Sequence, residues 1–176
     1  MTATVRAFDG KRPVLGTGVF LAETAAVIGD VVIGDDSSIW YGTVLRGDVM
    51  SIRVGARTSI QDGTIVHVTS GFSGTTIGSD CTIGHAAIIH ACTVEDSCLI
   101  GMGSILLDGV VVGRGSLVGA GALVTPGTII PPGSLVLGSP AKVKRPVNDK
   151  EREQIDYGAR HYVELARTYL ASGGES

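Results

Sequence analysis

An aliphatic residue returns at every sixth position over most of this sequence, often followed by glycine. A repeat of fixed period indicates a solenoid. Each six-residue unit would form a short strand and a turn, and three units would make a triangular coil of about 18 residues. The pattern therefore predicts an all-β solenoid, a parallel β-helix, from about Ala26 onward. Its aliphatic members are Ile33, Ile39, Leu45, Val54, Ile60, Val66, Ile77, Ile83, Val94, Ile100, Leu106, Val112, Val118, Val124, Ile130 and Val136.

Two interruptions break the six-residue period. Nine residues separate Leu45 from Val54, so extra residues are expected near Gly47 to Ser51. Eleven residues separate Val66 from Ile77. Loops on a rigid scaffold often carry function, so both insertions are candidate functional segments.

The pattern changes to a helical one near the C-terminus. Asn148 and Glu151 have the spacing of a capping box at a helix start. We expect a single domain. A β-helix would cover residues 1–147, including an N-terminal lead-in over residues 1–26 and a linker from Lys142 to Val147. A helix over residues 148–171 would pack on the β-helix, and a frayed tail would begin at Ser172. The apolar face of the helix has three- and four-residue spacing and comprises Ile155, Ala159, Tyr162, Ala166 and Tyr169.

Composition narrows the class of protein. Glycine is abundant at 26 residues, which favours turn-rich β structure. A net charge of −3 with scattered lysines and arginines argues against nucleic acid as a partner. The sequence contains no apolar run of membrane-spanning length, so we expect a cytoplasmic protein without membrane contact. Cys81, Cys92 and Cys98 form no Cys-x-x-Cys pair and are expected to be reduced core thiols.

Histidines provide the clearest chemical signal. Three of the four, His67, His85 and His90, lie in one short stretch, whereas His161 is expected at the surface of the helix. Three imidazoles with an open fourth position are the ligand set of catalytic zinc, and iron or cobalt would also accept them. His67 and His85 are eighteen residues apart, about one coil, and the spacing places His90 on the next face. Ligands on two faces do not converge within one chain, so a site shared between subunits of a ring is expected.

Several motifs resemble those of the γ-class carbonic anhydrases, which are left-handed β-helix proteins of hexapeptide repeats. The resemblance covers nearly the whole chain. The closing segment from Pro131 to Lys142 and the C-terminal helix also fit this family, and hexapeptide acyltransferases share the Pro-Ala-Lys ending. The motifs are Leu45-Arg46-Gly47-Asp48, Ile60-Gln61-Asp62-Gly63, Ile65-Val66-His67, the segment Ile83 to His90, and Leu99-Ile100-Gly101-Met102-Gly103.

This resemblance implies a homotrimer with a metal, most often zinc, in each interface. His67 and His90 would come from one subunit and His85 from its neighbour. The activity implied is reversible hydration of carbon dioxide to bicarbonate by a metal-bound hydroxide. The other residues implied are Arg46, paired with Asp48 and Asp62 in an ionic network across the interface; Gln61, a hydrogen-bond partner of the metal-bound water or bicarbonate; and Tyr162, the active-site tyrosine.

Other interpretations stay open at this level. Arg46, Asp48 and Asp62 could be solvated corner charges, and Tyr162 could be a core residue of the helix. A hexapeptide acyltransferase or a thioesterase would act on coenzyme A thioesters, with one histidine as general base. A catalytically weak metal-binding scaffold is a third class.

Residues 68–75 contain no aspartate or glutamate, so the acidic proton-shuttle loop of the most active family members has no counterpart there, which argues against fast turnover.

Overall fold

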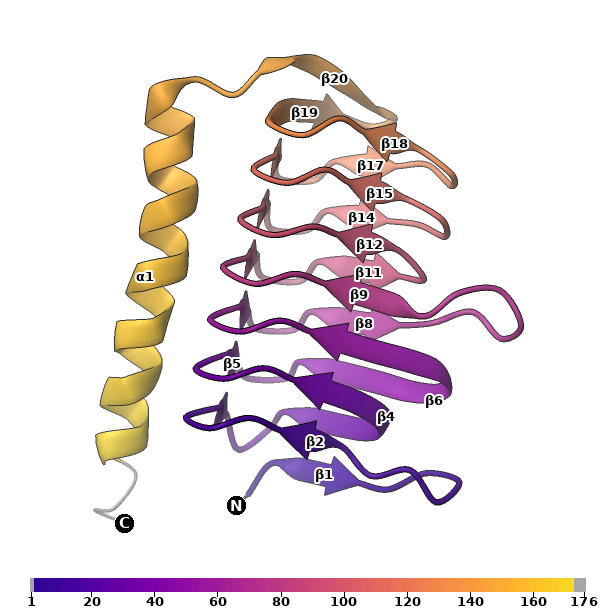
Figure 1. The fold of residues 1–176 in the computed structure, drawn as a ribbon, viewed down its shortest axis with the longest axis vertical. Helices are drawn as coiled ribbons and strands as arrows, with labels where there is room; N and C mark the ends of the chain where they lie inside the picture. Colours follow the sequence, from indigo (N-terminus) through magenta and orange to yellow (C-terminus); the bar gives the residue numbers. More distant parts are fainter. Residues whose placement is uncertain (1, 173–176) are drawn as a thin grey trace.

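The chain folds into a three-faced parallel β-helix with one long helix beside it (Figure 1). The structure is a computed structural model that describes residues 2–172. Strands pair in parallel from coil to coil, with the antiparallel pair β19–β20 at the C-terminal end. Faces 1 and 2 share one twelve-stranded sheet, because β4 and β6 run around the corner between them, and face 3 is an eight-stranded sheet.

The three faces stack strands of successive coils. Face 1 contains β1 (Thr4–Arg6), the first halves of β4 (Ala26–Ile33) and β6 (Val44–Val54), β8 (Ile65–His67), β11 (Ile88–His90), β14 (Ile105–Leu106) and β17 (Leu123–Val124). Face 2 contains β2 (Val14–Leu15), the second halves of β4 and β6, β9 (Thr75–Ile77), β12 (Thr93–Val94), β15 (Val111–Val112) and β18 (Ile129–Ile130). Face 3 contains β3 (Phe20–Leu21), β5 (Ser38–Ile39), β7 (Ser59–Ile60), β10 (Thr82–Ile83), β13 (Leu99–Ile100), β16 (Leu117–Val118), β19 (Ser134–Gly138) and β20 (Ala141–Pro146).

The six-residue pattern fills the core as predicted. Successive strand residues point to opposite sides of a sheet, so each unit sends its aliphatic side chain inward. Leu45, Ile60, Val66, Ile83 and Ile100 are all fully buried. The three cysteines are buried free thiols, and burial raises the pKa of Cys92 to about 12.

The lead-in predicted for residues 1–26 is wrong, because this segment forms the first coil. Thr4 pairs with Ala26, Val14 with Val32, and Phe20 with Ser38. Leu15 and Leu21 already follow the six-residue period that continues at Val27 and Ile33, and this signal was missed because turns separate the early strands. Regular order therefore begins at β1.

Both interruptions correspond to insertions in the coil. Val44 pairs with Ala26, eighteen residues earlier, whereas Ile52 pairs with Val31, twenty-one residues earlier, so three extra residues lie at this corner. The second insertion is the loop over residues 68–74, which projects from the stack between β8 and β9 (Figure 1). Both lie at the corner between faces 1 and 2.

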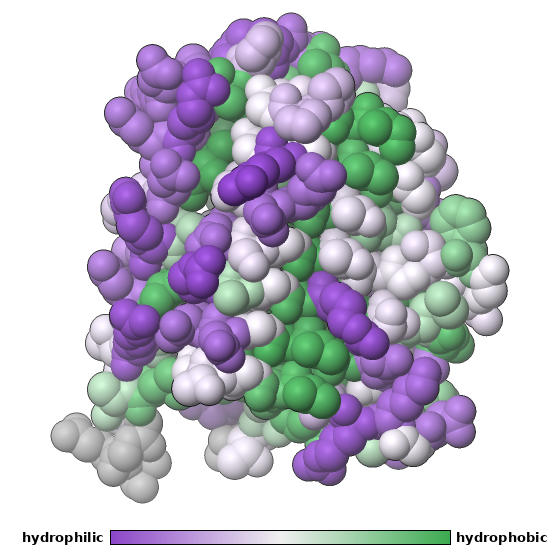
Figure 2. All heavy atoms as spheres, viewed as in Figure 1, coloured by the Kyte–Doolittle hydropathy of each residue, from purple (hydrophilic) through white to green (hydrophobic). Residues whose placement is uncertain are grey.

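Helix α1 (Asp149–Ser172) runs back along face 3 and contacts β3, β5, β7 and β10. Its inner side buries Ile155, Ala159 and Ala166, and its outer side is hydrophilic (Figure 2).

The predicted capping box is confirmed: the Glu151 N–H donates to Asn148 Oδ1 at 2.9 Å, and the Asn148 N–H donates to Glu151 Oε2 at 2.8 Å. The helix continues through Ser172, and the rest of the predicted tail lies outside the described residues. No helix among residues 2–172 has the length and hydropathy to span a bilayer.

Candidate metal centre

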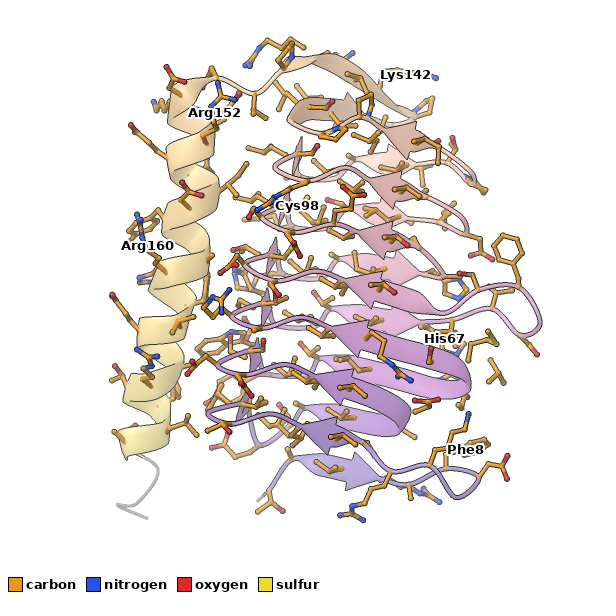
Figure 3. The ribbon with its side chains drawn as sticks, viewed as in Figure 1. Phe8, His67, Cys98, Lys142, Arg152 and Arg160 are labelled. Atoms are coloured by element: carbon orange, nitrogen blue, oxygen red, sulfur yellow. The ribbon has the colours of Figure 1, made fainter. Side chains whose placement is uncertain are left out.

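His67 and His90 lie one above the other at the ends of β8 and β11. They are register partners on adjacent strands of face 1. Val66 and Ile89, the residues directly before them, are buried in the core, so both histidines point outward because side chains alternate along a strand. His67 Nδ1 is 3.2 Å from His90 Nε2. Figure 3 labels His67 on the side of the stack away from α1, near the 68–74 loop. The two imidazoles form a preassembled pair at the corner between faces 1 and 2.

This pairing corrects the geometry that spacing predicted. The sequence interval places His85 directly above His67. It places His90 on the next face. In the structure, Ile65 pairs with Ile88 and Val66 with Ile89, an interval of 23 residues, because the 68–74 loop lengthens the coil. His90 therefore aligns with His67, and His85 lies elsewhere.

His85 occupies the turn between β10 and β11, at the corner between faces 3 and 1. Its backbone carbonyl accepts a hydrogen bond from the Gly103 N–H of the next coil. Gly84 allows the coils to stack this closely, because a Cβ there would lie 2.6 Å from the Met102 nitrogen. Within residues 2–172, no three histidine, cysteine, aspartate or glutamate side chains come together as a metal site. One chain therefore carries the three histidines in two places, at opposite edges of face 1.

Each of the three histidines contacts a carboxylate through one ring nitrogen. The pairs are His67 Nε2 with Asp48 Oδ1 at 3.1 Å, His85 Nδ1 with Asp62 Oδ2 at 2.8 Å, and His90 Nδ1 with Asp108 Oδ1 at 2.7 Å. Metal-binding histidines almost always donate their other ring N–H to such a group, which fixes the tautomer. The second nitrogen of each ring is then a lone-pair donor.

The nitrogens of the His67 and His90 pair fit a cation. If both N–H groups donate to Asp48 and Asp108, the lone pairs of His67 Nδ1 and His90 Nε2 face each other at 3.2 Å. Two lone pairs at that distance require a proton or a cation between or beside them. Two nitrogens at about 2.0–2.1 Å from a tetrahedral zinc would have a similar separation. The donor set at this corner therefore matches two ligands of a metal site.

The charged residues of the predicted network divide between the two corners. Arg46 forms an ion pair with Asp48, next to His67. Burial opposes ionisation of Asp48, but hydrogen bonds from Arg46 and His67 outweigh it and lower the pKa of this carboxyl. Asp62 contacts His85. Within one chain, Arg46 and Asp62 therefore lie in separate clusters.

Gln61 and Tyr162 lie on the His85 side. They line a cavity of about 470 Å³ between α1 and face 3, together with His85, Met102 and Thr82. Burial raises the pKa of Tyr162, and a side-chain hydrogen bond with Gln61 opposes this shift. The Tyr162 ring also packs edge-on against Trp40, with centroids 5.7 Å apart. The tyrosine thus contributes to the helix interface and to the cavity wall at once.

Thr82, Gly158 and His161 lie around this region. The Thr82 hydroxyl is the only buried side-chain oxygen or nitrogen without a hydrogen-bond partner in the described part of the chain. A Cβ on Gly158 of α1 would lie 2.8 Å from that oxygen, so this glycine permits the helix to approach. His161, the remaining histidine, is half-buried on α1 and stacks on Tyr157 at a centroid distance of 5.3 Å.

Sequence reasoning missed Asp108. Its Oδ1 contacts His90, and its Oδ2 accepts a hydrogen bond from Thr69 Oγ1 at 2.6 Å. The hydrogen bond from Thr69 and the one from His90 lower the pKa of this carboxyl. The available signal was the interval of eighteen residues from His90 to Asp108, one more than the seventeen-residue coil that pairs Ile89 with Leu106, which places the carboxylate next along the same edge.

The fold and the repeat define a hexapeptide-repeat protein. A family model described as "Bacterial transferase hexapeptide (six repeats)" matches residues 91–126. A solved Bacillus cereus protein, provisionally assigned as an acetyltransferase, superposes with a TM-score of 0.94 at 37% identity, covering 97% of this chain and 99% of that one.

Two curated relatives specify the family. The chain is 49% identical to γ carbonic anhydrase 2 of Arabidopsis thaliana mitochondria, with 96% of this chain aligned to 62% of that longer protein. It is 42% identical to a carbonic anhydrase of Geobacillus kaustophilus, over 93% of this chain and 90% of that protein. The chain belongs to the γ-carbonic-anhydrase-like family of hexapeptide-repeat proteins.

Proposed function

We propose that this protein is a metal-dependent carbonic anhydrase of γ type that hydrates carbon dioxide reversibly to bicarbonate. The observation that carries the proposal is the pair of His67 and His90 on adjacent coils, whose facing nitrogens are 3.2 Å apart and whose other nitrogens contact carboxylates. Similarity to proteins named carbonic anhydrase supports the same activity. His67 and His90 would hold the metal together with His85 of a second subunit.

The outward side of face 1 supports assembly of a homotrimer. Between its two histidine-bearing edges runs a ladder of aliphatic side chains, one per coil, which we call the face 1 ladder. Ile65 and Ile88 are 40% and 37% exposed. An apolar stripe of this kind marks a protein contact. The ladder comprises Val44, Ile65, Ile88, Ile105 and Leu123.

The two edges of face 1 suit a closed ring. If face 1 of each subunit packs against the next, the His85 edge of one subunit can approach the His67 and His90 edge of its neighbour. A repeated contact between two different surface patches generates a ring when the rotation closes. The site would then form only in the oligomer, with Arg46 and Asp48 on one side of the interface and Asp62 on the other.

A divalent cation held there would lower the pKa of a coordinated water to about 7. The chain's own groups would bind the substrate and handle protons. The Gln61 amide can donate to a bicarbonate oxygen or accept from a water in the cavity beside His85. Asp48 and Asp108 would keep the proton of each imidazole on the nitrogen that faces them. Zinc is the first candidate, and histidine nitrogens also accept iron(II) and cobalt(II).

The proposal is tested by stopped-flow hydration of carbon dioxide with protein reconstituted with zinc or, without oxygen, with iron(II). We expect a metal-dependent rate above buffer, lost on chelation and restored by metal. His90→Ala is the matched inactive variant, and His161→Ala is the control histidine. A wild-type rate equal to that of the metal-free protein would exclude carbonic anhydrase activity.

The same protein preparation also tests a second candidate function, that of a hexapeptide acyltransferase. A hexapeptide acyltransferase is favoured by the provisional assignment of the similar Bacillus cereus structure. It would bind acetyl-coenzyme A saturably, and metal removal would leave that binding intact. Calorimetric titration with acetyl-coenzyme A before and after chelation measures this directly.

A further inference from the structure

Asp108 connects His90 and the 68–74 loop, which belong to two other coils of the stack. It follows β14 and lies at the corner between faces 1 and 2, beyond His90 along the stack. One carboxylate oxygen contacts His90 Nδ1 at 2.7 Å, and the other accepts the Thr69 hydroxyl at 2.6 Å. Both oxygens of a single carboxylate are therefore engaged.

Thr69 belongs to the inserted 68–74 loop that directly follows His67. The loop closes on itself through the Thr69 N–H, which donates to the Ser73 carbonyl at 3.1 Å. At its base, Thr75 Oγ1 donates to the His67 carbonyl at 2.5 Å. Asp108 thus fixes the loop on one side and the His90 ring on the other.

We propose that Asp108 is a positioning residue for the metal site, which holds His90 in the tautomer with the proton on Nδ1 and anchors the 68–74 loop through Thr69. Nε2 of His90 is then kept as a lone-pair donor directed at its partner nitrogen on His67. A carboxylate behind a metal-binding imidazole also raises its basicity as a ligand. The inference rests on the proposed function, because it assumes that His90 binds a metal.

The arrangement assigns a role to an acid outside the insertion. The 68–74 loop contains no acidic side chain of its own. Asp108, two coils further along the stack, accepts a hydrogen bond from Thr69 of the loop instead. The loop conformation and the His90 orientation are therefore coupled through one residue, and a change in either is expected to disturb the other.

The test compares metal affinity, measured by competition with a chromophoric chelator, across full-length variants. Asp108→Ala is expected to weaken zinc or cobalt(II) binding by roughly 10–100-fold, the usual effect of removing such a partner. Asp108→Asn keeps an acceptor for His90 and is expected to restore most of the affinity. Asp80→Asn is the matched control: Asp80 has similar exposure, 38% against 34%, and pairs with Arg57.

Two readouts separate positioning from a merely structural role. The cobalt(II) visible absorption spectrum is expected to change in Asp108→Ala and to be preserved in Asp80→Asn. Thr69→Val, which removes the donor to Asp108 and keeps the carboxylate, is expected to weaken cobalt(II) binding less than Asp108→Ala. Circular dichroism of the metal-free variants checks folding.

The outcomes distinguish this inference from the proposed function. If His90→Ala abolishes metal binding while Asp108→Ala binds with unchanged affinity and spectrum, the positioning role is wrong and the metal site stands. If His90→Ala binds metal as tightly as the wild type, the metal site itself is wrong, and the role of Asp108 with it.

Discussion

His67 Nδ1 and His90 Nε2 face each other across 3.2 Å on adjacent coils, while His85 contacts Asp62 at the opposite edge of face 1. This division means that no single chain brings the three imidazoles together in the described residues. A site that uses all three must be completed by a second copy.

Subunit mixing tests the shared site directly. His85→Ala and His90→Ala homotrimers are each expected to have no metal-dependent activity. After unfolding together and refolding, a mixed trimer can combine His85 of one variant with His67 and His90 of the other. In a random equal mixture, about one quarter of interfaces would be intact, since each interface draws one edge from each neighbour. Activity that does not return on mixing, with trimers formed, would contradict the shared site.

The face 1 ladder is expected to hold the oligomer together. Ile88→Arg places a charge in the middle of this apolar stripe, and burying an unpaired charge is costly. Analytical ultracentrifugation should show a smaller species. Ile129→Arg on face 2 is the control, because Ile129 is 64% exposed and lies outside the ladder. Dissociation by the Ile129 variant alone would move the interface to face 2.

Thr82→Val is expected to stabilise the fold by about 1 kcal/mol, because it removes a buried hydroxyl without a partner and keeps its shape. Thr64→Val is the opposite case. The Thr64 hydroxyl donates to the Gly84 carbonyl at 3.0 Å, so the same substitution there should destabilise by about 1 kcal/mol. Urea unfolding measures both. A loss of stability in Thr82→Val would show that its hydroxyl is satisfied in the assembled protein.

The start of α1 is expected to weaken in acid. Hydrogen bonds from Arg145 and from the Asn148 N–H lower the pKa of Glu151 to about 2, from an ordinary value of 4.5. A lowered folded-state pKa means that the stabilisation is complete above pH 4.5 and is lost as the pH falls toward 2.

Glu151→Gln keeps the capping geometry and removes the charge. Its melting temperature should therefore vary less with pH between 4.5 and 2 than that of the wild type. Glu153→Gln, on the same turn of the helix, is the control. Equal pH dependence in the wild type and in Glu151→Gln would contradict the role of this ion pair.

The six-residue period was sufficient to predict the solenoid, because one inward aliphatic side chain per unit can be buried only by stacking coils. The helix was also predictable from its apolar face and its capping box, whose two hydrogen bonds are present. The first coil was not predicted, because the turns before Phe20 hide the continuation of the period through Leu15 and Leu21. The residue types of the candidate site were recognised in the sequence, but Asp108 was not, because its contacts depend on alignment between coils.

The sequence by itself determined the repeat and the closing helix and indicated the histidines as candidate ligands, since these follow from local periodicity and from side-chain chemistry. Only the tertiary structure decided which histidines meet. The 68–74 loop lengthens one coil, so the 23-residue interval from His67 to His90 becomes one coil and the eighteen-residue interval to His85 does not. Contacts between coils depend on the summed length of the turns between the two residues, and an insertion changes the interval for every pair that spans it, whereas Ile105 and Leu123, which both follow the loop, are again eighteen residues apart.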